Sequence, residues 1–124
     1  MENYPALKLN LAHFGRLKSS EDKWEKEILK LIEKYDNVYT DISYRGFDDN
    51  GYKVLKDAFQ YTKDEGFRSK LKSRILYGTD FMINLIKTGS YCEYTNYFLN
   101  TTHFSSLEKD AFCSVNPEKF LFKA

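Results

Sequence analysis

Hydrophobic positions near the N-terminus follow two different spacings, and each spacing predicts a different element. Residues 7–13, LKLNLAH, alternate apolar and polar side chains, which is the two-residue period of a β-strand. Beyond Gly15 the apolar spacing becomes three or four residues, which is typical of an amphipathic helix capped by Ser19 or Ser20. The expected buried stripe of this helix is Trp24, Ile28, Leu31 and Tyr35. The pattern therefore predicts a strand, a turn at Gly15 and a helix.

A second unit of the same kind follows. Residues 37–43, NVYTDIS, are rich in β-branched and aromatic side chains and predict a strand. We expect a loop over 44–51 and a helix over roughly 52–65, with Gly66 as its C-terminal cap. The expected buried side of this helix is Val54, Leu55, Ala58, Phe59 and Tyr61.

The third unit begins with residues 74–81, RILYGTDF, where an apolar run predicts a strand. We expect a loop over 82–90 and a helix over roughly 91–99. The side chains expected to pack from this helix are Tyr91, Tyr94 and Phe98.

Capping residues predict two further helical segments at the C-terminal end. Ser105 and Glu108 are three apart, the spacing of a capping box. Asn116 followed by Pro117 predicts an N-cap with proline at the first helical position, opening a short turn through 120–122. The apolar positions expected in the helix of the capping box are Leu107, Ala111, Phe112 and Val115.

Strands that alternate with helices predict βαβ units and a parallel sheet, so the fold class is α/β. A chain of 124 residues fits a single domain, 1–124. Three parallel strands leave two open sheet edges, and aromatic residues make up 17% of the chain. Open edges and abundant apolar surface predict association, and we expect a homo-oligomer.

Charge and composition narrow the class of partner. Nineteen basic and eighteen acidic residues give a net charge of +1 without a basic stripe, which disfavours nucleic acid and anionic membranes. We see neither an apolar stretch of about 20 residues nor a signal peptide, and therefore expect a cytoplasmic protein. Cys92 and Cys113 have no metal-ligand spacing, and we expect reduced, partly buried thiols rather than a disulfide.

Three ionisable residues lie late in the predicted strands, where parallel α/β folds build their sites. They are His13, Asp41 and Asp80. Each has a structural alternative: His13 could be satisfied by a backbone carbonyl, Asp41 could organise a loop, and Asp80 could cap the loop that follows it. His103 lies in a polar run and is expected at the surface.

Four motifs, in order, resemble the C-terminal part of the amidohydrolase superfamily, in its branch of metal-dependent hydrolases and decarboxylases. They are YPALKLNLAHFG (4–15), NVYTDIS (37–43), RILYGTDF (74–81) and NPEKFLF (116–122). The resemblance implies a partial (β/α)₈ TIM barrel, with three parallel βα units corresponding to strands six to eight plus C-terminal helices. Lys8 and Asn10 would then face the outer helices.

The resemblance also implies roles for particular residues. His13 would match the sixth-strand histidine, which binds a metal or positions and activates the attacking water. Asp80 would match the eighth-strand aspartate, a metal ligand that helps to deprotonate that water. Tyr44 and Arg45 would border the pocket of a small-molecule substrate. The implied cofactor is a divalent metal, with zinc favoured.

The first-strand His-x-His pair and the middle-strand ligands of that superfamily have no counterpart in this chain. The resemblance therefore implies a C-terminal fragment with half a site, inactive alone, whose partner is a complementing N-terminal half. Two alternatives remain open: a non-catalytic remnant that acts as an oligomerisation or protein-interaction module, and a small α/β binding domain without a catalytic role. The substrate, and the choice between hydrolysis and decarboxylation, also stay open.

Overall fold

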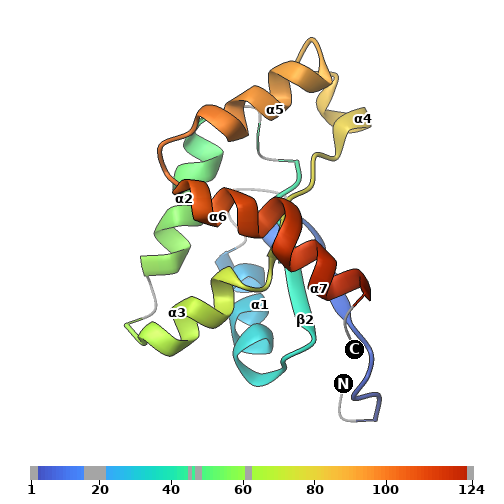
Figure 1. Ribbon diagram of the computed structural model, residues 1–124, viewed down its shortest axis with the longest axis vertical. Coiled ribbons are helices and arrows are strands. Elements are labelled where there is room, and N and C mark those ends of the chain that lie inside the picture. The colour runs from blue at the N-terminus through green and yellow to red at the C-terminus, as the bar shows by residue number, and fades with distance from the viewer. Residues whose placement is uncertain (1–2, 16–21, 45, 47–48, 61–62, 123–124) are drawn as a thin grey trace.

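The structure is a computed structural model that describes residues 3–15, 22–44, 46, 49–60 and 63–122. Its centre is a parallel sheet of three strands, β1 (Leu9–Leu11), β2 (Val38–Asp41) and β3 (Ile75–Leu76), in the order β1-β2-β3 (Figure 1). Leu9 pairs with Val38, and Thr40 pairs with Ile75. The prediction of three parallel strand-then-helix units is confirmed, and the mixed architecture is compatible with part of an α/β barrel.

The strands are shorter than the sequence predicts. β1 ends at Leu11 because the chain then enters a tight turn, η1 (Ala12–Gly15), in which three consecutive residues have positive φ. These are His13 (φ 61°), Phe14 (φ 52°) and Gly15 (φ 69°). The alternation of apolar and polar residues extends to His13, but the strand itself ends two residues earlier, at Leu11.

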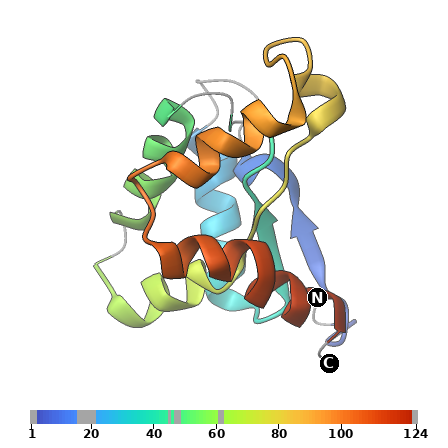
Figure 2. The same cartoon turned by 45° about the horizontal axis from the view of Figure 1, so that its top comes forward.

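The two faces of the sheet have different surroundings. Val38 belongs to the apolar core, together with Ile28 and Ile32 from α1 (Asp22–Lys34). Because side chains alternate along a strand, Tyr39 points to the opposite face, where its ring meets Phe120 with centroids 5.0 Å apart. Phe120 lies in the C-terminal helix α7 (Asn116–Phe122), which crosses in front of the strands in Figure 2.

The orientation expected for Asn10 is wrong, whereas Lys8 does reach a helix, α7. Asn10 pairs with Tyr39 and so lies on the face turned away from α1, where its side-chain amide donates to Asp41. Lys8 Nζ donates to the carbonyl oxygens of Lys119 and Phe120, at 2.8 and 2.9 Å. The leucines of β1, rather than its polar residues, occupy the face that packs toward α1.

Helix α1 turns most of the expected stripe toward the core, since Ile28 is buried and Leu31 and Tyr35 are partly buried against it, but the expectation for Trp24 is wrong. Trp24 is 64% exposed, whereas Glu25, Ile28 and Ile32 are buried. The backbone of Gly15 lies close to this helix, because a Cβ added there would stand 2.7 Å from Ile28 Cδ1 and 3.1 Å from Trp24 Cβ. The turn after β1 presses against the start of α1, and the indole ring projects outward.

The second crossover contains two helices where the sequence predicted one. Helix α2 (Asp49–Gln60) begins earlier than expected, and α3 (Glu65–Lys72) follows it. The prediction that Gly66 caps a helix C-terminus is wrong, because Gly66 lies in the first turn of α3, whose N-cap is Asp64. Leu55, Ala58 and Phe59 are buried as predicted, whereas Tyr61 and the side chain of Val54 lie outside the described part of the chain.

The C-terminal segment contains α4 (Phe81–Asn84), α5 (Tyr91–Asn100), α6 (Ser106–Asp110), a π-helical turn η2 (Ala111–Val115) and α7. The capping box of Ser105 and Glu108 is confirmed. The N-cap predicted at Asn116 is wrong: η2 continues the helix, and Asn116 has helical angles (φ −71°, ψ −45°). Phe112 is fully buried, but Leu107 is 80% exposed.

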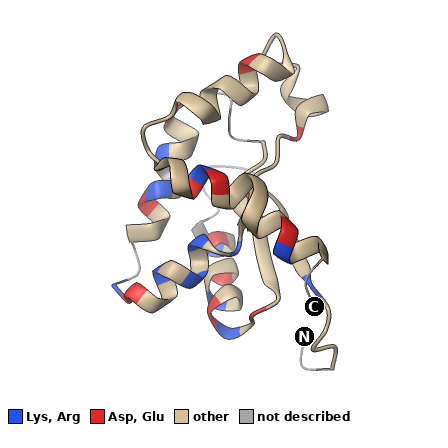
Figure 3. Ribbon diagram, viewed as in Figure 1, with Lys and Arg blue, Asp and Glu red and all other residues tan. Residues whose placement is uncertain are grey.

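The surface carries charges of both signs and two exposed thiols. Charged side chains of both signs are interspersed on α1, α3 and the α6–α7 segment (Figure 3). Cys92 and Cys113 are free, as expected, but both are exposed rather than partly buried. Within the described residues, every helix is too short or too polar to cross a membrane.

Candidate functional site

Left-handed backbone conformations gather at the carboxyl ends of the three strands. His13 follows β1, Tyr44 (φ 69°) follows β2, and Asp80 (φ 49°) follows β3. Non-glycine residues rarely adopt positive φ, and the conformation is maintained only where the surroundings enforce it. Each strand therefore ends in a forced turn that directs its next side chains to one end of the sheet.

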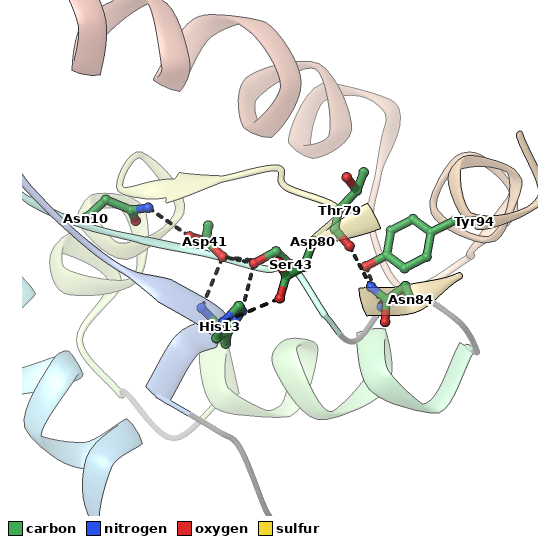
Figure 4. Close-up of polar contacts among 9 residues, drawn as sticks. Asn10, His13, Asp41, Ser43, Thr79, Asp80, Asn84 and Tyr94 are labelled. Atoms are coloured by element: carbon green, nitrogen blue, oxygen red, sulfur yellow. Dashed lines mark hydrogen bonds and ion pairs between the residues drawn. The ribbon is translucent and has the colours of Figure 1, made fainter. Parts of the chain in front are cut away.

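His13 and Asp80 meet at this end of the sheet although they follow the two outer strands. His13 Nε2 lies 3.6 Å from Asp80 Oδ2, and the two side chains are 24% and 30% exposed. Figure 4 shows the two side chains pointing toward each other, with a dashed line that marks this ion pair. The structure thus brings together the two residues that the sequence singled out, in partial contact with solvent.

Asp41, at the end of β2, organises the turns on both sides of it. Its Oδ1 accepts the backbone N–H of His13 at 3.0 Å and that of Ser43 at 3.1 Å, and also the Ser43 hydroxyl. Its Oδ2 accepts the side-chain amide of Asn10 at 2.7 Å. These contacts match the structural alternative for Asp41, that of a residue that orders a loop.

The electrostatics of Asp41 favour its charged form. Burial alone would raise its pKa, because removal from water disfavours a carboxylate. The hydrogen bonds from Ser43, His13 and Asn10 outweigh burial and hold the pKa of Asp41 below its ordinary value. Asp41 is therefore an ionised, fully engaged acceptor at neutral pH.

Ser43 joins Asp41 to the imidazole of His13. Its Oγ lies 2.8 Å from His13 Nδ1 and also contacts Asp41 Oδ1 (Figure 4). The structural alternative for His13, a bond to a backbone carbonyl, is replaced by this bond to a side chain. Sequence reasoning missed Ser43, and the available signal was its position two residues after Asp41, on the same face of an extended segment.

The segment that carries Asp80 is fitted closely against β2. A Cβ added to Gly78 would lie 3.1 Å from Ser43 Cβ, so the small residue permits the close approach. Asn84, which is buried, donates its side-chain amide to the carbonyl oxygen of Thr79 at 2.5 Å. Asp80 precedes α4, but its side chain makes no capping bond to that helix among the described residues, so the loop-cap alternative gains no support.

Aromatic side chains border the site. The rings of Tyr44 and His13 have centroids 5.7 Å apart, and Lys87 Nζ lies 6.0 Å from the centre of the Tyr44 ring. The hydroxyl oxygen of Tyr94 accepts the backbone N–H of Gly46 at 2.9 Å, and burial raises the pKa of Tyr94 to about 12. Arg45, the other expected substrate contact, lies outside the described residues.

The side chains present supply part of a metal site. Two zinc ligands at about 2.0–2.1 Å from one ion stand about 3.4 Å apart in tetrahedral geometry, and the His13–Asp80 separation is 3.6 Å. A histidine nitrogen and a carboxylate oxygen are both ordinary zinc ligands. Among the described residues, however, no group of three or more His, Cys, Asp or Glu side chains could hold an ion. The distance between the two side chains is thus compatible with a shared ion, but the described residues supply only two ligands for it.

The second histidine of the chain lies apart from this pair. His103 Nε2 is 2.9 Å from Asp49 Oδ2, and its side chain is 25% exposed. Asp49 stands at the start of α2 and also receives the hydroxyl of Thr101. This pair ties the segment after α5 to α2, so His103 is a partly covered structural residue.

Comparison with known proteins identifies the family of the chain. The sequence matches the family described as Amidohydrolase over residues 1–123, which is nearly the whole chain. Neither a curated protein nor a solved structure gives a significant match.

Proposed function

The chain belongs to the amidohydrolase superfamily, and on this basis we propose that it is the C-terminal portion of a metal-dependent hydrolase or decarboxylase barrel. In this proposal β1, β2 and β3 correspond to strands six to eight. The observation that carries it is the convergence of His13 and Asp80 from the two outer strands, with Nε2 and Oδ2 3.6 Å apart.

His13 and Asp80 would hold a divalent cation, with zinc favoured by the nitrogen ligand. When bound, such an ion lowers the pKa of water to about 7 and polarises a carbonyl oxygen. The chain's own contribution is to hold the two side chains in place, and the oxygen of the Asp80 carboxylate that does not hold the ion would accept a proton. The ring of Tyr44, 5.7 Å from that of His13, is placed to contact a small organic substrate.

The portion described here holds half of the proposed site. Two ligands are fewer than the three protein ligands of an ordinary catalytic zinc site. β1 forms one edge of the sheet, and Leu7 and Leu9 beside this edge are 50% and 36% exposed. We propose that strands outside these residues pair with this edge and bring the missing ligands, so that the portion alone is inactive.

The proposal can be tested without a substrate by locating a paramagnetic ion. Mn²⁺ is titrated into the ¹⁵N-labelled chain, and the broadening of each amide signal is measured by NMR. We expect weak binding that broadens signals around His13 and Asp80 first. Asp80→Asn should remove most of this broadening, because one of two ligands is lost.

The other histidine–carboxylate pair provides the matched control. Asp49→Asn removes the partner of His103 and should leave the broadening around His13 unchanged. Equal broadening across all exposed carboxylates would overturn the proposal, as would tight one-to-one binding of zinc that survives Asp80→Asn. The first result would show that no site exists, and the second that the ligands lie elsewhere.

A second candidate function is an oligomerisation or interaction module. The specific observation is a run of exposed apolar side chains after β3, which comprises Met82, Ile83, Leu85 and Ile86. Exposed apolar surface of this kind commonly marks a contact with another protein. Sedimentation of the chain over a range of concentrations decides: self-association lost in Ile86→Glu supports this candidate, and a monomer at high concentration contradicts self-association.

A further inference from the structure

The hydrogen bonds of Asp41 determine which way the Ser43 hydroxyl donates. Each of the four bonds that reach this carboxylate comes from a donor: Asn10 Nδ2, His13 N, Ser43 N and Ser43 Oγ. An ionised carboxylate only accepts hydrogen bonds, and a serine hydroxyl has a single proton. The contact between Ser43 Oγ and Asp41 Oδ1 therefore requires Ser43 to donate its proton to Asp41.

Because Ser43 donates its proton to Asp41, the direction of its hydrogen bond with His13 is also determined. His13 Nδ1 lies 2.8 Å from Ser43 Oγ, whose proton is already committed. Ser43 can then only accept, so Nδ1 must carry a hydrogen and donate it. In a neutral imidazole with hydrogen on Nδ1, the other nitrogen, Nε2, is left with its lone pair.

The same carboxylate also fixes the backbone of His13. The His13 N–H is bound to Asp41 Oδ1 at 3.0 Å, and the residue holds a positive φ of 61°. The side chain of Asp41 thus restrains His13 at two points, directly through the main chain and through Ser43 at the ring. Figure 4 shows this arrangement, with the free edge of the ring turned toward Asp80.

We propose that Ser43, oriented by Asp41, is a positioning residue that holds His13 in the Nδ1–H tautomer and presents the Nε2 lone pair toward Asp80. In this form Nε2 can bind a cation or accept a proton, whereas the opposite tautomer would place a hydrogen between Nε2 and Asp80 Oδ2. The use of this lone pair in catalysis rests on the proposed function, but the tautomer itself does not.

The tautomer can be measured directly, because the chain contains only two histidines. Long-range ¹H–¹⁵N spectra of the ¹⁵N-labelled chain at pH 9, above the ordinary histidine pKa of about 6.5, report which ring nitrogen carries hydrogen. We expect Nδ1–H for His13. We expect Nε2–H for His103, because its Nε2 lies 2.9 Å from Asp49 Oδ2 and must donate. The two rings should therefore give opposite patterns in one spectrum.

Ser43→Ala removes the acceptor at Nδ1, and we expect His13 to lose the Nδ1–H pattern and convert to Nε2–H, which can donate to Asp80. Ser114→Ala, at an exposed position, should leave both patterns unchanged. The amide spectrum shows in each case whether the variant is folded.

The wild-type spectrum alone can overturn the inference, so it does not depend on a folded variant. A His13 ring with Nε2–H, a ring protonated on both nitrogens at pH 9, or an Nδ1–H pattern that persists in folded Ser43→Ala would each do so. The Mn²⁺ titration is independent of these results. Loss of the tautomer with ion binding intact would refute the role of Ser43 alone, and the converse would refute the metal site alone.

Discussion

The side-chain amide of Asn116 donates to the backbone carbonyl oxygen of Ile75 at 2.8 Å. The same amide donates to the carbonyl oxygen of Lys72 at 2.9 Å, and Asn116 is only 1% exposed. One buried residue of the C-terminal helix therefore satisfies carbonyl groups at the end of α3 and in β3. This bond attaches the last helix to the strand that leads to Asp80.

We expect Asn116→Ala to lower the free energy of unfolding by about 2–3 kcal/mol, because two buried carbonyl groups lose their donor. Urea unfolding followed by circular dichroism measures this change. Asn96→Ala, at an exposed position of α5, is the matched control and should change stability by less than about 0.5 kcal/mol. Equal stability of Asn116→Ala and the control would contradict the assigned role.

Truncation to alanine should affect stability very differently at two apolar residues of the α6–η2 segment. Phe112 is fully buried and packs against Phe59 and Phe104, whereas Leu107 is 80% exposed. We expect Phe112→Ala to cost about 3–5 kcal/mol through a cavity in the core. Leu107→Ala should cost less than about 0.5 kcal/mol. Thermal and urea unfolding of the two variants provide the measurement. A large loss of stability in Leu107→Ala would show that the side chain of Leu107 is buried in solution.

The free energy of unfolding should decrease at acid pH, because the Glu108 carboxylate becomes protonated. Partial burial raises the pKa of Glu108, but hydrogen bonds from Lys72 and from the Ser105 N–H, with the charge of Lys56, outweigh it and lower the pKa to about 2. A carboxylate with a lowered pKa contributes its stability above the ordinary value of 4.5, and this stability is lost as the pH falls toward 2. The contribution is full at neutral pH.

Comparison of wild type with Glu108→Gln over pH 2–7 measures this contribution. We expect a difference of about 1 kcal/mol at pH 7 that shrinks below pH 4.5, since a partly exposed pair is screened by solvent. Glu27→Gln is the control, because the Glu27–Lys30 pair is well exposed on α1. A difference for Glu108→Gln that stayed constant down to pH 2 would show that its charge is not involved.

Gly46 is predicted to tolerate no side chain. A Cβ added there would lie 2.1 Å from the hydroxyl oxygen of Tyr52 and 2.7 Å from the ring and hydroxyl of Tyr94. Both tyrosines are buried, so neither ring can move aside. We expect Gly46→Ala to lower stability by about 1–3 kcal/mol through overpacking.

Gly66→Ala is the contrasting substitution. Gly66 lies within α3, where a Cβ would approach only Asp64 Oδ1, at 3.1 Å. Alanine is favoured over glycine by about 0.5–1 kcal/mol in a helix interior, and less is expected in this first turn, so the variant should be neutral or slightly stabilised. Differential scanning calorimetry of the two variants tests the pair. A more stable Gly46→Ala would mean that the loop after β2 is not packed against α2 and α5.

The sequence alone was sufficient for those features that depend on neighbouring residues. Alternating and three-to-four-residue apolar spacings located β1 and α1, since periodicity reflects which side of an element is buried. Runs of β-branched, aromatic and apolar residues located β2 and β3. The capping box at Ser105 was also readable, because its hydrogen bonds join residues three apart. His13 and Asp80 could be selected as site candidates because the ends of parallel strands lie at one edge of a sheet.

Features that depend on distant residues required the tertiary structure. Only the tertiary structure showed that Glu25 of α1 is buried and that Trp24 is exposed. The hydrogen bonds that Asn116 donates to Lys72 and Ile75 join residues more than 40 positions apart in the sequence. Because η2 continues as a helix into Asn116, this residue is a buried hydrogen-bond donor within the helix and not the expected N-cap. The link from Asp41 through Ser43 to His13 joins residues about 30 positions apart. No local pattern encodes such pairs, because their geometry exists only after the strands have been placed side by side.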